Sequence, residues 1–321
     1  MDLIYTNNRR IDQGVLSAYG FDLSFGASEN DFELILSADS PVLDSGAIVY
    51  IEGTEYGGIV DSVKAATNGN TITYSGRTWH GCMNSKVISP DAGENYYTVS
   101  GDANTVLATL ISRLSLSDLF TVAEGLANIN ISRYQFNRYC KGYDGIRAML
   151  AANGAKLKIS WEDRTVCLSA VPVADYTESP VDGDIATLTV KRQTNKVNHL
   201  ICLGAGELAE REVLHLYVDR FGNIGTTQYY TGLDEYTDTY DYSNAESSDD
   251  LMKGGTDRLK ELLDSDTADI SINESNGITY DIGDIVGAKE YRSGVAVSAA
   301  VSQKIVKIQN GAIRTDYKTG G

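Results

Sequence analysis

The first ninety residues alternate apolar and polar positions with the two-residue period of β-strands. In DFELILS, which begins at Asp31, the apolar residues Phe32, Leu34 and Leu36 occupy every second position. The segments GAIVYIEG, YGGIVDSV and NTITYSG follow at short spacing and are separated by Gly and Asn. Short strands with such breaks are typical of a sandwich or barrel. We therefore predict a small β-barrel domain over residues 1–90.

A helical period replaces the strand period after residue 90. SGDANTVLATLISRL has apolar residues such as Leu107 and Leu110 on one helical face, with Asp102 as its N-cap. GYDGIRAMLAANG predicts a second helix that ends at Gly154. KLKISWEDRTVCLSAVP then alternates on both sides of a polar turn, which predicts a β-hairpin. Together these segments indicate a small α/β domain over residues 91–175.

The last third returns to the strand period. TLTVKR, LICLGAG and EVLHLYVD are followed by an acidic, Tyr-rich loop and by a predicted helix near 249–264. ADISIN, GDIVGAKE, VAVSAAVSQKIVKIQN and AIRTDYKTG then close the chain. We predict a second β-barrel domain over residues 176–321. The fold class expected is mainly β with an α+β insertion, in which two small β-barrels flank a domain built from helices and a hairpin.

The string LGAGELAE places Gly204 and Gly206 at the spacing of a dinucleotide-binding loop. That function needs a helix that begins at the glycines, because its amides and dipole hold the pyrophosphate. Here Glu207 and Glu210 would repel a phosphate, and the next segment, REVLHLYV, has the period of a strand. The pattern favours a hairpin with a glycine turn over a cofactor site.

The segment GLDEYTDTYDYSNAESSDD at 232–250 is acidic and contains no Lys or Arg. Its carboxylates are the oxygen ligands that calcium prefers, but the spacing matches no EF-hand and the central glycine of that loop is missing. We favour a solvated connection whose last aspartates cap the following helix. Calcium binding by the loop at 234–250 is the alternative.

The net charge bears on whether the protein binds nucleic acid. The chain of 321 residues has a formal charge of −17 at pH 7. Firm binding to nucleic acid needs Lys and Arg to displace counterions, so the charge argues against it but does not exclude a surface that DNA slides past. No apolar run approaches the roughly 20 residues of a bilayer span, and the N-terminus lacks a secretory leader. We expect no membrane insertion and synthesis in a cytoplasm.

Residues that usually carry chemistry are sparse. The four cysteines lie far apart without a Cys-x-x-Cys pair, so we interpret them as buried thiols and predict neither a zinc site nor a disulfide framework. Only three histidines occur, and His199 and His215 lie in predicted strands. No nucleophile elbow, zinc-protease helix or phosphate loop is found. We therefore predict a protein that is not an enzyme and uses no cofactor or metal.

Four segments carry short motifs in a fixed order along the chain. The motif residues are Gly76, Arg77, Lys86, Ile88 and Pro90 in TITYSGRTWHGCMNSKVISP; Tyr143 and Asp144 in GYDGIRAMLAANGAKLKISWEDRTVCLSAV; Asn195, Val197, Gly204, Gly206, Glu207 and Arg211 in NKVNHLICLGAGELAER; and Asp281, Gly283, Asp284, Gly294 and Val295 in TYDIGDIVGAKEYRSGVAVSAAVSQKIVKI. In this order the segments resemble the tail hub, or baseplate hub, family of tailed bacteriophages and related contractile injection systems. Trp79 and His80 depart from the family's pattern.

The resemblance marks part of this set as architectural turns without a ligand, namely Gly76, Arg77, Pro90, Gly204, Gly206, Glu207, Arg211, Asp281, Gly283 and Asp284. It implies a homotrimeric ring at the virion tail tip or baseplate, in which each chain supplies two β-barrel tube-like domains. Such a ring joins the six-fold tail tube to a three-fold spike or fibre. The implied partners are two further copies of the chain, the tail tube or distal tail protein, a spike or tail-fibre protein and the tape-measure protein.

DNA would pass through such a ring without specific binding. Part of the acidic excess would then line the bore and keep DNA from sticking, and solubility alone is the other explanation of the charge. A calcium-dependent glycan- or receptor-binding β-protein at the tail tip is the alternative function.

Overall fold

The computed structural model describes residues 2–181, 186–191, 196–220, 222–245, 247–263, 267–273, 278–289, 296–309 and 311–319. Strands dominate these residues, and four α-helices accompany them. The chain divides into two compact units, a larger one of Met1–Leu188 with Ile270–Gly320 and a smaller one of Thr189–Asp269. The prediction of a mainly β chain with a helical insertion is thus confirmed.

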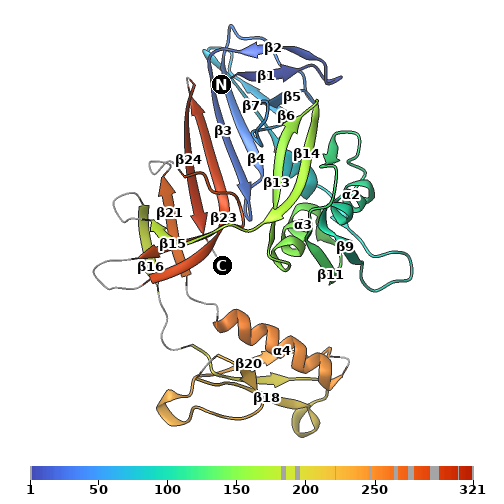
Figure 1. The fold of residues 1–321 in the computed structure, drawn as a ribbon, viewed down its shortest axis with the longest axis vertical. Coiled ribbons are helices and arrows are strands. Elements are labelled where there is room, and N and C mark those ends of the chain that lie inside the picture. Colours follow the sequence, from blue (N-terminus) through green and yellow to red (C-terminus); the bar gives the residue numbers. More distant parts are fainter. Residues whose placement is uncertain are drawn as a thin grey trace. The chain divides into compact units, whose positions relative to one another are not determined.

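The larger unit is built on one extended sheet (Figure 1). In order across the sheet its strands are β16 (Ala186–Lys191), β21 (Thr267–Asn273), β24 (Ala312–Thr319), β23 (Ala296–Gln309), β3 (Tyr19–Gly26), β4 (Asp31–Ser37), β7 (Thr71–Thr78), β6 (Gly57–Ala65), β5 (Ile48–Tyr50), β1 (Leu3–Thr6) and β2 (Asp12–Leu16), and β15 (Asp175–Val181) and β22 (Ile285–Lys289) branch from β23. This order has two ends, so the sheet is not a closed barrel within the described residues. The expectation of two barrels is not confirmed.

Alternation explains how the strands build the first core. Strand β4 exposes and buries its residues in turn, with Phe32, Leu34 and Leu36 on the buried face. Strand β23 pairs antiparallel with β3, and its buried Val306 and Ile308 join the same apolar cluster. A period of two places every second side chain on one face, so the sequence pattern alone identified which residues of β4 are buried.

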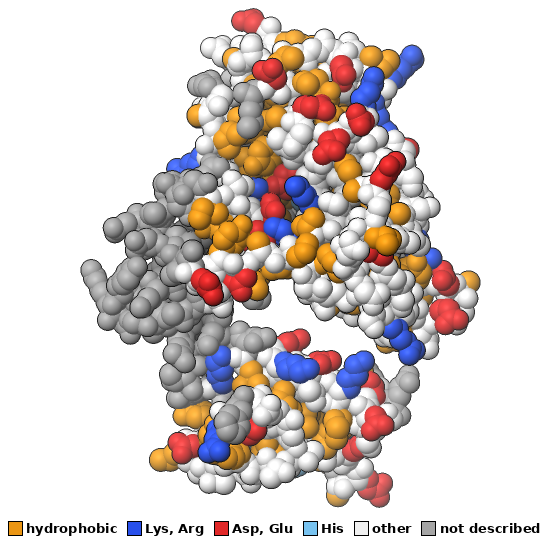
Figure 2. All heavy atoms as spheres, in the orientation of Figure 1, with side chains coloured by type: hydrophobic (Ala, Val, Ile, Leu, Met, Phe, Trp, Pro, Cys, Tyr) orange, Lys and Arg blue, Asp and Glu red, His pale blue; other side chains and the backbone are white. Residues whose placement is uncertain are grey.

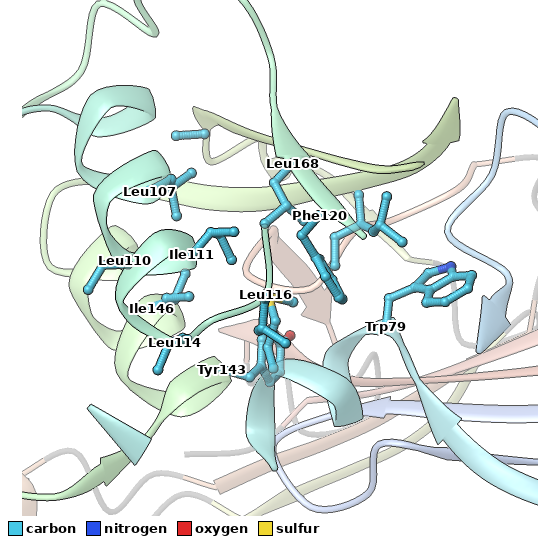
Figure 3. Close-up of a cluster of buried hydrophobic side chains, with 14 of the residues drawn as sticks. Trp79, Leu107, Leu110, Ile111, Leu114, Leu116, Phe120, Tyr143, Ile146 and Leu168 are labelled. Carbon is cyan, nitrogen blue, oxygen red and sulfur yellow. The ribbon is translucent and has the colours of Figure 1, made fainter. Parts of the chain in front are cut away.

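A second core lies between three helices and a hairpin. Its elements are α1 (Trp79–Asn84), α2 (Ala103–Arg113), α3 (Gly142–Ala151), the hairpin of β13 (Ala155–Glu162) and β14 (Thr165–Pro172), and β10 (Phe120–Val122), with the short pairs β8 (Val87–Ile88) with β12 (Cys140–Lys141) and β9 (Thr98–Asp102) with β11 (Asn130–Gln135). Figure 3 shows Leu107, Leu110 and Ile111 of α2 pointing into this core, toward Ile146 of α3 and Leu168 of β14.

The predicted helix ends and the predicted turn of this region are confirmed. Asp102 is the N-cap of α2, and its carboxylate accepts the backbone amide of Asn104 at 3.0 Å. The chain turns after α3 at Gly154, whose φ is +67°. The hairpin reverses at Asp163 and Arg164, which have φ of +48° and +64°, as expected for a two-residue hairpin turn.

The smaller unit is a four-stranded sheet with one helix against it. Its elements are β17 (His199–Leu203), the 3₁₀ turn η1 (Leu208–Glu210), β18 (Val213–Val218), β19 (Ile224–Gly225), the 3₁₀ turn η2 (Gly232–Asp234), β20 (Thr237–Asp241) and α4 (Ser248–Leu263). The helix predicted near 249–264 is therefore present. Gly255 of α4 lies so close to the sheet that a Cβ there would be 2.4 Å from Cys202 Sγ. Glycine has a low helix propensity, and this close packing explains its presence at position 255.

The two units do not follow the three consecutive domains predicted from the sequence. Strand β23, near the end of the chain, runs along β3 near its start, with Lys307 opposite Asp22 and Gln303 opposite Gly26. Alternation identifies a strand but not its neighbour in the sheet, so the joining of the two chain ends was not visible in the pattern. Among the described residues, no helix combines the length and apolar composition that a membrane crossing needs.

The cysteines are all free thiols. Cys82 and Cys202 are buried, and Cys140 and Cys167 are partly exposed. Burial raises the pKa of Cys82 to about 12, so this group stays protonated at neutral pH. The interpretation as buried thiols is therefore confirmed for Cys82 and Cys202 and holds only in part for the other two.

Candidate functional site

The first motif closes the end of strand β7. Arg77 binds Asp61 of β6 with two parallel contacts of 2.8 Å, and its backbone amide donates to the same carboxylate at 3.1 Å. The hydrogen bonds from Arg77 lower the pKa of Asp61. A Cβ on Gly76 would lie 1.9 Å from the carbonyl oxygen of Ile59, so only glycine fits there. Pro90 lies further on, half-buried in the loop after β8.

The second motif is the connection between β17 and β18. The strands pair antiparallel, and the nine residues between them contain no α-helix, only the three-residue 3₁₀ turn η1. The predicted hairpin is therefore confirmed, and no helix begins at the glycines. Gly206 has a φ of +99°. Arg211 donates to the carbonyl of Gly204 at 3.0 Å and binds Asp241 at 2.5 Å, which ties the turn to β20. Glu207 is exposed beside it.

The third motif holds a buried lysine. Lys156 Nζ of β13 donates to Asp284 Oδ1 at 2.6 Å and to Asp281 Oδ2 at 2.7 Å. Asp284 is only 1% exposed and also accepts the backbone amides of Ala174 and Asp281, at 3.0 and 2.9 Å. Gly283 has a φ of +99°, and a Cβ on it would lie 3.2 Å from Lys156 Cβ. We call Lys156, Asp281, Gly283 and Asp284 the Lys156 clasp.

The clasp keeps Lys156 charged although it is buried. Burial alone would lower the pKa of Lys156, but the hydrogen bonds to Asp281 and Asp284 outweigh that effect and raise it. The backbone of the turn is held as well, because Gly283 donates to the carbonyl of Val301 and Val301 donates to that of Asp284, both at 2.8 Å. The clasp therefore joins the hairpin to strands β22 and β23.

A second buried lysine was not found by sequence reasoning. Lys304 of β23 is 2% exposed, and its Nζ donates to Glu55 Oε1 at 2.7 Å. The rings of Phe25, Tyr56 and Tyr317 surround it, with centroids 6.0, 5.5 and 5.8 Å from Nζ. Burial lowers the pKa of Lys304, but the charge of Glu55 and the nearby tyrosines outweighs burial and raises it. We call this group, together with His80, the Lys304 cluster.

His80 completes the Lys304 cluster as a neutral ring. It stacks on Phe25 with a centroid distance of 4.7 Å, and it is 3% exposed. Burial, and then the charge of Lys304, lower the pKa of His80 to about 3. His80 Nδ1 has no hydrogen-bond partner within the described part of the chain. The signal that the sequence did contain is Lys304 itself, which occupies the same face of β23 as the buried Val306.

Two cavities of about 330 Å³ each lie beside the turn of the Lys156 clasp. The polar cavity is lined by Glu55, His80 and Asp281 together with residues of β13, and the apolar cavity lies beside Gly283. Ile282 contributes to both. Figure 2 shows a recess in the larger unit where acidic and basic side chains meet between apolar ones.

The motif residues do not converge on one site. Gly76 and Arg77 close one end of β7, Pro90 lies in a loop, and Gly204 to Arg211 belong to the smaller unit. Asp281, Gly283 and Asp284 do come together, on Lys156. Asn195, Gly294 and Val295 lie outside the described residues.

The histidines of the smaller unit form a hydrogen-bonded chain that the sequence did not suggest. His199 Nδ1 lies 2.6 Å from Glu235 Oε1, and His199 Nε2 lies 2.8 Å from His215 Nδ1. Within the described residues no group of three or more His, Cys, Asp or Glu side chains is arranged to hold a metal ion. Of the acidic loop at 234–250, Glu246 lies outside the described part.

The groups of the larger unit are arranged to hold the fold. Lys156 and Lys304 are paired cations with raised pKa values, so they are poor bases and nucleophiles at neutral pH. His80 is a neutral ring with a pKa too low for a proton donor at that pH. Cys82 remains a thiol. The chemistry of these residues is that of buried ion pairs and stacked rings.

A scan against protein-family models finds no match, and neither does a comparison with curated proteins. Solved structures do match along the whole chain. The 43 kDa tail protein of prophage MuSo2 from Shewanella oneidensis has a TM-score of 0.57 at 13% identity, over 99% of this chain and 98% of that one. Prophage tail protein gp18 from Listeria monocytogenes EGD-e has a TM-score of 0.56 at 14% identity, over 99% of this chain and 94% of that one.

A chain of the phage P2 virion baseplate in its activated conformation is also similar, with a TM-score of 0.53 and 11% identity, over 100% of this chain and 99% of that one. At these identities the likeness concerns the fold. The chain has the fold of phage tail and baseplate proteins, which confirms the resemblance at that level.

Proposed function

We propose that this protein is a structural tail hub of a phage tail or phage-tail-like particle. Three copies would form a ring that joins the six-fold tail tube to the three-fold tip, spike or fibre and surrounds the channel for DNA or tape measure. The observation that carries the proposal is a fold shared with a tail protein over 99% of this chain and 98% of that one. The role is structural, at the tail tip or baseplate, and requires no catalysis.

An open sheet edge supports assembly into a ring. Strand β2 is the last strand of the large sheet, and within the described residues only β1 pairs with it. Val15 on this strand is 53% exposed, and Ile11 just before it is 51% exposed. Unpaired edges with exposed apolar residues favour pairing with another chain, and a cyclic ring removes them. We propose that β2 contacts the next copy.

An acidic sheet face supports a channel role. Asp22 of β3 lies directly opposite Glu33 of β4. On the same face Lys307 of β23 lies opposite Asp22, with Nζ 4.0 Å from its carboxylate, and Arg77 of β7 lies opposite Asp31. Burial, and then the charge of Glu29, raise the pKa of Asp31. Like charges directly across a strand pair destabilise a sheet, so the pair of Asp22 and Glu33 favours a use for the charge, although basic residues flank it on both sides. We propose that this face lines the bore, where it would repel passing DNA.

The first test is the mass of the purified full chain by light scattering. One chain has a mass of 34.8 kDa, and three times 34.8 kDa gives about 104 kDa for the proposed ring. We expect the trimer mass, with a central hole by negative-stain microscopy. A single-chain mass at every concentration, with no rings on the grid, would contradict a ring that forms by itself.

A pair of variants tests the proposed edge. Val15→Asp places a charge on β2 and is expected to lower the trimer fraction. Val42→Asp adds the same charge at another site, where the side chain is 77% exposed, and is expected to leave the mass unchanged. Equal behaviour of the two variants would rule out β2 as the contact.

A further inference from the structure

The apolar cavity opens where a helix, a hairpin and two strands of the larger unit meet. Its lining includes Arg147 and Ala151 of α3, Gly154, Gly283 and Ala300. Arg147 and Ala151 are four residues apart and therefore lie on one face of the helix. The other members of this group are small, so the volume of about 330 Å³ is left open between backbone segments.

The walls of the apolar cavity are held in place before any ligand binds. Gly283 belongs to the Lys156 clasp, and its amide donates to the carbonyl of Val301, another lining residue. Val173, another lining residue, donates to the carbonyl of Gly154 at 3.1 Å. A preformed apolar pocket with few polar groups is the usual form of a binding site, since little ordering cost remains.

Arg147 is the charged residue of this cavity, whose lining also includes Ser302, and the described residues give Arg147 no counter-ion. No hydrogen bond or ion pair to another described residue is found for its guanidinium. Its Nε is buried without a partner among them, as are Asp144 Oδ1 on the same helix and Arg113 Nε. Other partly buried arginines are paired, as Arg113 is with Asp91 at 2.6 Å and Arg211 with Asp241 at 2.5 Å. A buried donor without an acceptor is costly, so the cavity is complementary to an anion.

The size of the apolar cavity favours a protein side chain over a larger ligand. Pockets for drug-sized molecules run from about 300 to 1,000 Å³, and this one is at the lower limit. One aromatic or aliphatic side chain in such a pocket, next to a charged contact with an arginine, is the usual anchor of a protein interface. The carboxylate that pairs with Arg147 would then belong to a residue adjacent to that anchor.

We propose that the apolar cavity beside Gly283 is a docking site for a partner polypeptide, which inserts an apolar side chain and pairs an adjacent carboxylate with Arg147. The site would bind an acidic-apolar segment of another chain. It would discriminate against segments with an amide in place of the carboxylate. This inference does not depend on the ring or on the hub function.

Two capped dipeptides test the proposal on the full chain. N-acetyl-aspartyl-phenylalanine amide carries both proposed groups, and N-acetyl-asparaginyl-phenylalanine amide lacks only the charge. Titration is followed by the methyl NMR signals of ¹³C-labelled alanine, assigned to Ala151, Ala155 and Ala300, which line the cavity. We expect these methyls to shift and the aspartyl peptide to bind about tenfold or more tightly, as for a hydrogen bond to a charged group.

Matched variants decide whether Arg147 is responsible. Arg147→Met keeps an apolar stem and removes the charge, and is expected to abolish the preference for the aspartyl peptide. Arg138→Met removes the same charge from an exposed arginine that does not line the cavity and is expected to preserve the preference. Unchanged thermal melting of both variants shows that the fold is intact. Equal affinity for the two peptides in the unmodified chain, or a preference that survives Arg147→Met, would overturn the proposal.

Discussion

The larger unit contains two buried lysines that are stabilised in different ways. Lys156 has an 8% exposed side chain and binds two carboxylates, those of Asp281 and Asp284. Lys304 has a 2% exposed side chain and binds one carboxylate, that of Glu55, inside a set of aromatic rings. If one carboxylate is lost, Lys156 still pairs with the other. If Glu55 is lost, Lys304 keeps only its contacts with aromatic rings. Two lysines that are both buried are therefore expected to differ in how well they tolerate the loss of a partner.

The largest effect is expected at the single partner of Lys304. Glu55→Gln removes the negative charge and leaves Lys304 buried without a counter-ion. Breaking a buried pair by removing one partner costs about 3–5 kcal/mol, so we expect the free energy of unfolding of the larger unit to fall by about 3 kcal/mol or more. The measurement is urea unfolding of the full chain, followed by circular dichroism.

Two further variants test whether the loss comes from the unpaired charge of Lys304. Glu55→Gln combined with Lys304→Met replaces the pair by uncharged groups and should recover most of the loss, because the penalty comes from the unpaired charge. Glu52→Gln removes a carboxylate three residues away that is exposed and pairs with no basic side chain of the described chain. It should change stability by less than about 0.5 kcal/mol. Equal losses of stability for Glu52→Gln and Glu55→Gln would show that the pairing of Glu55 with Lys304 has no special importance.

The second effect is a pH dependence that His80 gives to the Lys304 cluster. The pKa of His80 is lowered from 6.5 to about 3 by burial and by Lys304. The folded state therefore binds fewer protons than the unfolded state, so this stability is present above pH 6.5 and is lost as pH falls. Each pH unit in this window corresponds to about 1.4 kcal/mol. Between pH 6.5 and 4.5 we expect a loss of about 2–3 kcal/mol from His80.

A variant isolates this loss from the titration of carboxylates. His80→Phe keeps an aromatic ring against Phe25 but cannot be protonated. As pH falls from 6.5 to 4.5, the variant should keep the roughly 2–3 kcal/mol of stability that His80 costs the unmodified chain. The unfolding free energy of the variant should therefore rise by that amount relative to the unmodified chain. Parallel pH profiles for the two proteins would show that His80 is not excluded from protons in the folded state.

The third effect concerns the buried carboxylate of the Lys156 clasp. Asp284→Asn removes the charge that accepts Lys156 and two backbone amides. Asp281 still pairs with Lys156, so we expect a loss of about 2 kcal/mol, less than for Glu55→Gln. The same urea unfolding measures it. A loss larger than that of Glu55→Gln would mean that a second carboxylate gives Lys156 no protection.

The sequence predicted the secondary-structure elements better than it predicted which strands pair with each other. Alternation identified the buried face of β4, and the cap at Asp102 marked the start of α2, because both are local features of the backbone. The hairpin at Gly204 and Gly206 was recognised because a strand period follows the glycines. The pairing of β23 with β3 was missed, since no local pattern encodes which distant strand is the neighbour.

The candidate site was predicted in part for the same reason. The resemblance marked Asp281, Gly283 and Asp284 as a turn, and Gly283 does have a positive φ, of +99°. Their partner Lys156 is 128 residues from Asp284 and nothing in the motif points to it. Lys304 shares a buried face with apolar residues of β23, which is a signal of a buried charge that the sequence interpretation did not use.

The smallest effect is expected at Asp281, and it tests whether exposure or pairing decides the cost within one clasp. Asp281 binds Lys156 at 2.7 Å, nearly the same distance as Asp284, but its side chain is 42% exposed and that of Asp284 is 1% exposed. Solvent screens an exposed ion pair, which is worth about 0–1 kcal/mol. Asp281→Asn should therefore cost less than about 1 kcal/mol in urea unfolding, and Asp284→Asn more. If the two substitutions lower the free energy of unfolding equally, the contact distance rather than the burial of the carboxylate determines the strength of the clasp. The contrast with Lys304 would then have to be explained by the number of partners alone.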